Sequence, residues 1–155
     1  MNAPAKIASA LPADYNSDGY GWAMAQAELL RRQRFSEVDW ENIIEEIECV
    51  GRRERSEYES HLIRVLAHMI KWEAQPEHRG MSWWLSIMNG RRDAERFLKV
   101  NPSLKPVLDD IFSDAVKYAR RQAADETGLP QASIDAVDLS YRDATSKPVL
   151  RPDDT

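Results

Sequence analysis

Acidic, histidine and lysine side chains between residues 45 and 75 are the groups of this chain best suited to chemistry. Glu45 and Glu46 lie on one predicted helix, and His68 and Lys71 lie on the next. If the two helices pack face to face, these four residues form a polar cluster. Helical bundles build metal sites from Glu and His on facing helices. The second helix carries a strip of polar residues at three- or four-residue spacing: Glu57, His61, Arg64, His68, Lys71 and Gln75.

The spacing of these residues argues against a metal site. A dinuclear bundle site needs Glu-x-x-His on two helices, and the sequence contains no such motif. His61 and His68 are seven residues apart, about 10 Å along a helix, which is too far for one ion. The HExxH motif and zinc-type Cys/His spacings are absent as well. We therefore expect no metal and no other cofactor.

The alternative role for the same cluster is structural. Charged groups beside an apolar core are usually paired, and such a pair fixes the register of two helices. We expect Glu45 or Glu46 to meet His68 or Lys71. A metal-dependent enzyme that uses His68 with Glu45 or Glu46 remains the second interpretation.

Other catalytic chemistry has little support in the sequence. Cys49 is the only cysteine, and it lies near the predicted C-terminus of a helix, where the helix dipole disfavours a thiolate. The sequence contains no Gly-x-Ser-x-Gly elbow, no P-loop and no Rossmann glycine pattern.

Paired arginines form a second group of candidates. Arg52, Arg53, Arg91 and Arg92 would bind nucleic acid if they shared one face. Residues 51–100 carry ten basic and seven acidic side chains, whereas the whole chain has a net charge of −5. An acidic total weighs against general nucleic-acid binding, so this function ranks third.

Helical periodicity runs through most of the chain and predicts an all-α fold. We expect a single compact bundle of about five helices over residues 15–130, preceded by a flexible segment 1–14 and followed by an extended or partly disordered tail, 131–155. The predicted helices are 18–34, 39–50, 52–74, 82–100 and 103–127. Gly51 is expected to cap the second of them, and Gly90 to permit a close helix crossing.

The apolar stripes of these helices predict the core. Tyr58, Leu62, Val65, Leu66, Met69 and Trp72 mark the helix 52–74 as the centre of the bundle. The preceding helix contributes Trp40, Ile43, Ile44, Ile47 and Val50.

Composition places the chain among globular proteins. It has 155 residues, of which 43% are hydrophobic and 30% charged. We expect no membrane span, no secretory signal and, with one cysteine, a cytoplasmic location.

Several short motifs in this order resemble a bacterial family catalogued as domain of unknown function 29, which is common in cyanobacteria. The matching pieces are Asp18-x-Tyr20-x-Trp22, Asp39-Trp40-Glu41-Asn42-Ile43, Glu45-Glu46-Ile47, Gly51-Arg52, Leu66-Ala67-His68, Lys71-Trp72, Gln75-Pro76, Ser82-Trp83 and Asn101-Pro102-Ser103-Leu104. The resemblance covers about residues 14–130. It implies an all-α fold and no particular activity.

The preferred function is therefore non-catalytic. We expect a small cytoplasmic protein-interaction or regulatory module that presents a helical face to another protein or to a second copy of itself. We expect no membrane partner, and nucleic acid ranks below another protein or a second copy of the chain as a partner.

Overall fold

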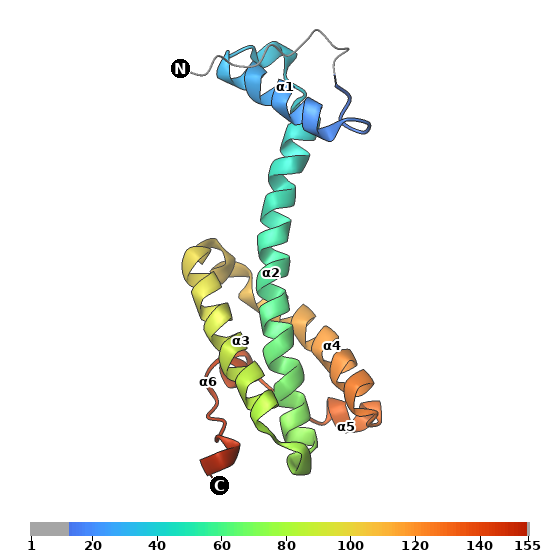
Figure 1. Ribbon diagram of the computed structural model, residues 1–155, viewed down its shortest axis with the longest axis vertical. Coiled ribbons are helices and arrows are strands. Elements are labelled where there is room, and N and C mark those ends of the chain that lie inside the picture. The colour runs from blue at the N-terminus through green and yellow to red at the C-terminus, as the bar shows by residue number, and fades with distance from the viewer. Residues whose placement is uncertain (1–12, 155) are drawn as a thin grey trace. The chain divides into compact units, whose positions relative to one another are not determined.

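The computed structural model describes residues 13–154 and confirms the all-α fold (Figure 1). Four long helices are present in this range: α1 (Gly19–Arg31), α2 (Trp40–Ala74), α3 (Met81–Val100) and α4 (Leu108–Thr127). Two short helices follow, α5 (Gln131–Asp135) and α6 (Tyr141–Ser146). Short 3-10 turns connect the long helices: η1 (Phe35–Glu37), η2 (Pro76–His78) and η3 (Pro102–Val107). A further turn, η4 (Pro152–Asp154), follows α6. Almost all of the expected flexible segment, 1–14, lies outside the described residues.

The chain divides into two units, residues 1–51 and residues 52–155. Helix α2 contributes its first turns to the N-terminal unit and the remainder to the C-terminal unit. None of the helices in residues 13–154 combines the length and the apolar character that a membrane span requires.

The predicted break at Gly51 is wrong, because α2 continues through this residue as one α-helix. Gly51 lacks the left-handed conformation of a C-terminal cap, which Gly128 adopts at the end of α4 with φ of 68°. Glycine in a helix interior costs only about 1 kcal/mol relative to alanine. The good helix formers on both sides of Gly51 outweigh that cost.

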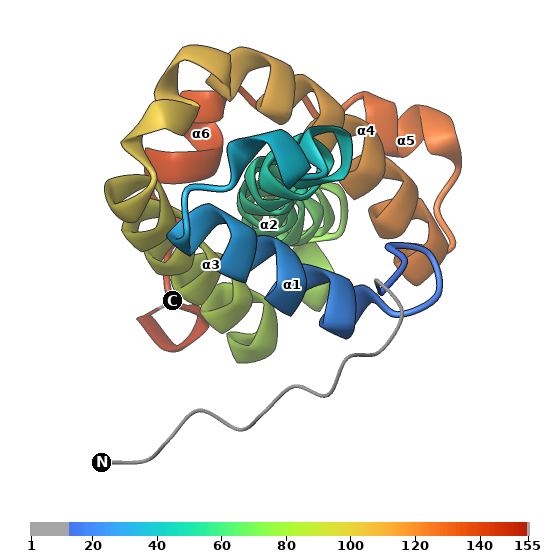
Figure 2. The ribbon, with the colours of Figure 1, turned by 90° about the horizontal axis from the view of Figure 1, so that it is seen from above.

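The second part of α2 is the centre of the C-terminal unit, as its apolar stripe predicts. Figure 2 shows it surrounded by α3, α4 and α6. All six residues of the stripe are buried: Tyr58, Leu62, Val65, Leu66, Met69 and Trp72. The expected close crossing at Gly90 is also present, because a β-carbon built there would lie 2.7 Å from Cγ2 of Val65. A side chain at position 90 would push α3 away from α2.

The segment after Gly128 is helical and packed, where the sequence predicts an extended or partly disordered tail. Ile134, Leu139 and Ala144 are buried in the same core as α2. Ser140 and Asp143 form a capping box that starts α6. The sequence pattern does not predict α5 and α6, because five or six residues are too few to show a helical period.

Candidate functional site

The N-terminal unit is held together by a small polar network. The indole Nε1 of Trp22 donates a hydrogen bond to Asp39 Oδ2 at 3.0 Å, and the backbone N of Asp39 donates to Gln26 Oε1 at 2.8 Å. Asp39 also accepts a hydrogen bond from the side-chain amide of Asn42 at 2.7 Å. The bond from Asn42, followed by the bond from Trp22, lowers the pKa of Asp39 and keeps it ionised. This network fixes α1 against the first turn of α2.

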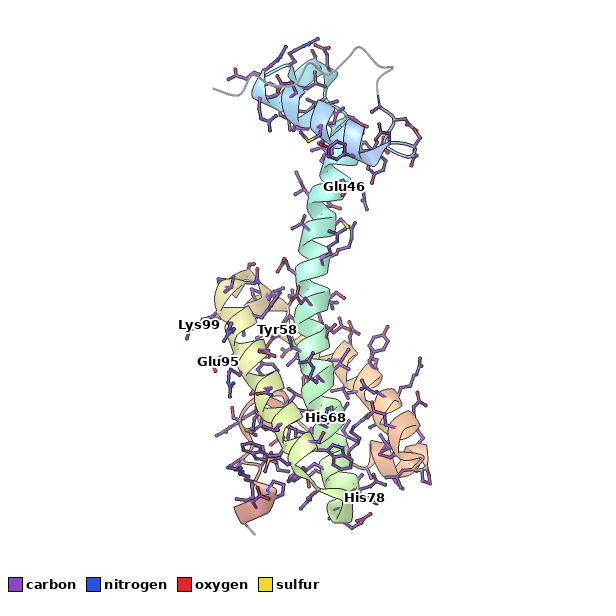
Figure 3. All side chains as sticks on the ribbon, viewed as in Figure 1. Glu46, Tyr58, His68, His78, Glu95 and Lys99 are labelled. Atoms are coloured by element: carbon purple, nitrogen blue, oxygen red, sulfur yellow. The ribbon has the colours of Figure 1, made fainter. Side chains whose placement is uncertain are left out.

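The apolar core of this unit is small. In residues 13–51, the buried side chains are Trp22, Gln26 and Val38. Tyr15 packs edge-on against Trp22, with ring centroids 4.8 Å apart, and its hydroxyl donates to Glu46 Oε1 at 2.7 Å. Figure 3 labels Glu46 on α2. Two buried apolar side chains are far fewer than an independently stable unit of this size requires.

Large apolar side chains are exposed on the same unit. Of the twelve exposed large hydrophobic residues in the described chain, seven belong to residues 13–51: Tyr20, Met24, Phe35, Trp40, Ile44, Ile47 and Val50. Tyr20 and Met24, expected in the stripe of the first helix, are exposed, because the buried face of α1 carries Trp22 and Gln26 instead. Of the stripe that the sequence places in the core at 40–50, only Ile43 is partly buried, and the other four residues are exposed.

An apolar groove of about 790 Å³ lies between α1 and the first turns of α2. Its apolar lining comes mainly from one face of each helix: Ala23, Ala27, Leu30, Ile43, Ile47 and Val50. Glu46 and the polar part of Tyr15 lie at its edge. Nothing in its lining has the arrangement of a general acid, a general base or a nucleophile.

The surroundings of this groove are acidic. Residues 13–51 contain nine acidic and three basic side chains. All three arginines are paired within the unit, Arg31 and Arg32 with Glu28 and Arg34 with Glu37. The excess negative charge of the unit is therefore not neutralised by its own cations.

The polar cluster expected from the sequence has different partners in the structure. Because α2 is one helix, no turn at Gly51 folds Glu45 and Glu46 back toward His68 and Lys71. Glu46 instead accepts the hydrogen bond from Tyr15. The expectation that Glu45 or Glu46 meets His68 or Lys71 is thereby corrected.

The buried Lys71 pairs with Glu126 of α4, a residue that the sequence did not single out. Its ammonium also lies 5.1 Å from the ring centroid of Trp83. Hydrogen bonds from Lys71 and then Gln122 lower the pKa of Glu126, so the pair is ionic. A buried lysine needs a carboxylate partner, so the sequence could predict that such a partner exists. It could not identify the partner, because acidic residues occur in three turns of α4 and only the packing of the helices selects Glu126.

The His68 side chain, labelled in Figure 3, forms a hydrogen bond with the backbone of its own helix. Its Nδ1 is 2.8 Å from the carbonyl oxygen of Arg64, one turn earlier on α2. Burial lowers its pKa, so the neutral ring is favoured. Within residues 13–154, no three His, Cys, Asp or Glu residues lie close enough together to hold a metal ion.

The candidate arginines differ in their environments. Arg52 and Arg53 are exposed on α2. Arg91 turns inward, where Nε donates to the carbonyl oxygen of Ala144 at 2.7 Å. Arg92 is exposed on α3 and lines a second pocket.

Comparison with known proteins gives one match. A family model described as "Domain of unknown function DUF29" matches residues 15–144. No curated protein and no solved structure matches the chain. The match extends past Pro130 to α6, which agrees with the packing of this segment in the core.

Proposed function

Since the chain belongs to the DUF29 family of domains of unknown function, we propose on physical grounds that it is a non-catalytic, cytoplasmic protein-interaction module. Its N-terminal unit binds a basic amphipathic helix of a partner protein. The partner helix lies in the groove between α1 and the first turns of α2.

The exposed apolar surface of the N-terminal unit is the observation that carries this proposal. Ile47 is 66% exposed and Val50 is 56% exposed, although both belong to the apolar stripe of a helix. Contiguous exposed apolar surface on a small unit marks an interaction site. The polar network around Asp39 positions the two helices, but it leaves their facing apolar side chains without a third layer.

A helix fits this groove by shape. Helix α1 has 13 residues and is about 20 Å long, so it forms one wall along about four turns of a partner helix at most. An amphipathic helix laid between two helices inserts residues at positions i, i+3, i+4 and i+7. It would complete a three-helix arrangement and bury Ile43, Ile47 and Val50 together.

Charge selects a basic partner over a second copy of the chain. With nine acidic and three basic side chains, two copies of residues 13–51 would bring a net charge of the same sign into one interface. Like charges brought together oppose association, whereas a basic helix would gain both attraction and a faster encounter.

A designed peptide tests the proposal directly. The probe is an amphipathic peptide of about 18 residues, with leucines at helical spacing and lysines on the other face. Its counterpart carries glutamates in place of the lysines. Fluorescence anisotropy of the labelled peptides is measured against the full chain. We expect the lysine peptide to bind saturably, more weakly at high salt, and the glutamate peptide to bind much more weakly.

A pair of variants locates the binding. Ile47→Gln removes an exposed side chain whose burial by the peptide stabilises the complex by about 1.5 kcal/mol, so affinity should fall about tenfold. Val100→Gln changes an apolar residue of the C-terminal unit that is 75% exposed, and it should leave affinity unchanged. Equal binding of both peptides, or equal loss in both variants, would contradict the proposal. So would a dimer of the full chain in sedimentation that Ile47→Gln dissociates, because the groove would then bind a second copy.

A further inference from the structure

A second pocket, of about 700 Å³, lies in the C-terminal unit. Four elements build it: α2 through Tyr58, α3, η3 through Lys105, and α6 through Tyr141, Thr145 and Ser146. Figure 3 labels Tyr58 on α2 and Glu95 and Lys99 on α3. Its volume is in the range of pockets that bind small organic molecules.

The walls of this pocket are fixed by hydrogen bonds. The hydroxyls of Tyr58 and Tyr141 are 2.8 Å apart, which ties α2 to α6. Arg91 donates from Nε to the carbonyl oxygen of Ala144 at 2.7 Å and from Nη2 to that of Asp143 at 2.9 Å. Burial, together with the hydrogen bond to Tyr141, raises the pKa of Tyr58, so its hydroxyl stays neutral. The pocket therefore exists before any ligand binds.

Positive charge dominates the lining. Arg91, Arg92, Lys99 and Lys105 face a single acid, Glu95. Among the described residues, Arg92, Lys99 and Lys105 have no carboxylate within ion-pair distance, in contrast to Arg55, Lys71, Lys117 and Lys147 of the same unit. Three cations that form no ion pair with a described residue, around a cavity lined by one acid, attract an anion.

The cations are arranged unevenly. Lys99 is the penultimate residue of α3, and Lys105 belongs to η3, which follows at once, so both belong to one end of the pocket. Arg92 lies on α3 seven residues before Lys99, which is about 10 Å along the helix axis. The apolar part of the lining includes Met88, Ala94 and Leu98 of the same helix.

We propose that this pocket binds a small phosphate monoester with an apolar or aromatic group. The phosphate lies between Lys99 and Lys105, and the apolar group packs against Leu98 and Tyr58. A phosphate monoester carries close to two negative charges at neutral pH, whereas a carboxylate carries one. Two lysines therefore complement the charge of the phosphate better than that of a carboxylate. Arg92 contacts the far end of the ligand and contributes less.

Isothermal titration of the full chain tests this assignment with phenyl phosphate, inorganic phosphate and phenol as probes. Phenyl phosphate should bind with one-to-one stoichiometry. Inorganic phosphate should bind at least about tenfold more weakly because it lacks the apolar contacts, and phenol should not bind measurably. Circular dichroism of each variant confirms that it is folded.

The double variant Lys99→Gln/Lys105→Gln should weaken phenyl phosphate binding by more than about tenfold, since two charge-assisted hydrogen bonds are lost. Arg92→Gln should have a smaller effect. Lys117→Gln removes an exposed lysine outside the pocket and should have none. The proposal is overturned if phenyl phosphate fails to saturate, if inorganic phosphate binds equally well, or if the double variant and Lys117→Gln behave alike.

Discussion

The buried ion pair between Lys71 and Glu126 makes a sharp prediction, because its two ends differ in exposure. The Lys71 side chain is 6% exposed, whereas that of Glu126 is 40% exposed. Glu126→Gln therefore leaves an ammonium group in the interior without a counter-charge. Lys71→Met leaves a carboxylate that water can reach.

The two substitutions should differ in their effect on the free energy of unfolding. Removing one partner of a fully buried pair costs about 3–5 kcal/mol. Since the glutamine amide oxygen can still accept a hydrogen bond from Lys71, we expect about 2–3 kcal/mol for Glu126→Gln. Methionine has nearly the shape of the lysine stem and can keep the contact with Trp83, so Lys71→Met should cost less than about 1 kcal/mol.

The pair should also depend on pH in a defined direction. The pKa of Glu126 is lowered from 4.5 in the folded state, chiefly by Lys71. Its contribution to stability is therefore fully present above pH 4.5 and is lost as pH falls through the lower, folded-state pKa. Glu126→Gln lacks this contribution at every pH, so its difference from the wild type should shrink in acid.

Urea unfolding of the full chain, followed by far-UV circular dichroism at pH 7 and at several values below 4.5, measures these differences. If Lys71→Met proves as destabilising as Glu126→Gln, the unequal exposure of the two groups does not control the energetics. A gap between wild type and Glu126→Gln that stays constant in acid would refute the assigned ion pair.

Three further predictions concern a helix crossing, helix propensity and a hydrogen bond. Gly90→Ala should destabilise the chain by about 1–3 kcal/mol through the clash with Val65, and adding Val65→Ala should recover part of that loss in the same urea assay. Gly51→Ala should instead stabilise helix α2 by about 0.5–1 kcal/mol, since nothing lies within 4 Å of its added methyl; unchanged or reduced helicity on heating would contradict this. Trp22→Phe removes the hydrogen bond to Asp39 and should weaken the N-terminal unit by about 1 kcal/mol, seen as faster amide exchange in α1 but not in α4.

Local pattern accounts for the parts of the fold that the sequence predicts well. The stripe from Tyr58 to Trp72 repeats over four turns, and its residues are buried. Gly90 has no side chain and lies beside an apolar face, which indicates a close crossing, and this crossing is present. Both features depend on the helical period, which the sequence of any long amphipathic helix displays.

The short C-terminal helices show where local pattern is insufficient. Helices α5 and α6 have five and six residues, too few for a periodic stripe. The sequence Ser140-Tyr141-Arg142-Asp143 does contain a capping-box pattern, which was the available signal for α6. These helices are stable because Ile134 and Ala144 reach the core, which is a tertiary effect.

For the candidate sites, too, some features follow from local sequence and others depend on tertiary packing. Which residues share a helix face follows from the sequence alone, because the helical repeat is a local property: Ile43, Ile47 and Val50 lie together, as do His68 and Lys71. What each face meets depends on how distant segments pack. The sequence carries no local signal that pairs Lys71 with Glu126, brings Lys105 and α6 to α3, or leaves Ile47 and Val50 exposed. Those outcomes arise from the balance of burial and charge over the folded chain, and a single residue such as Gly51 can change them by continuing a helix or ending it.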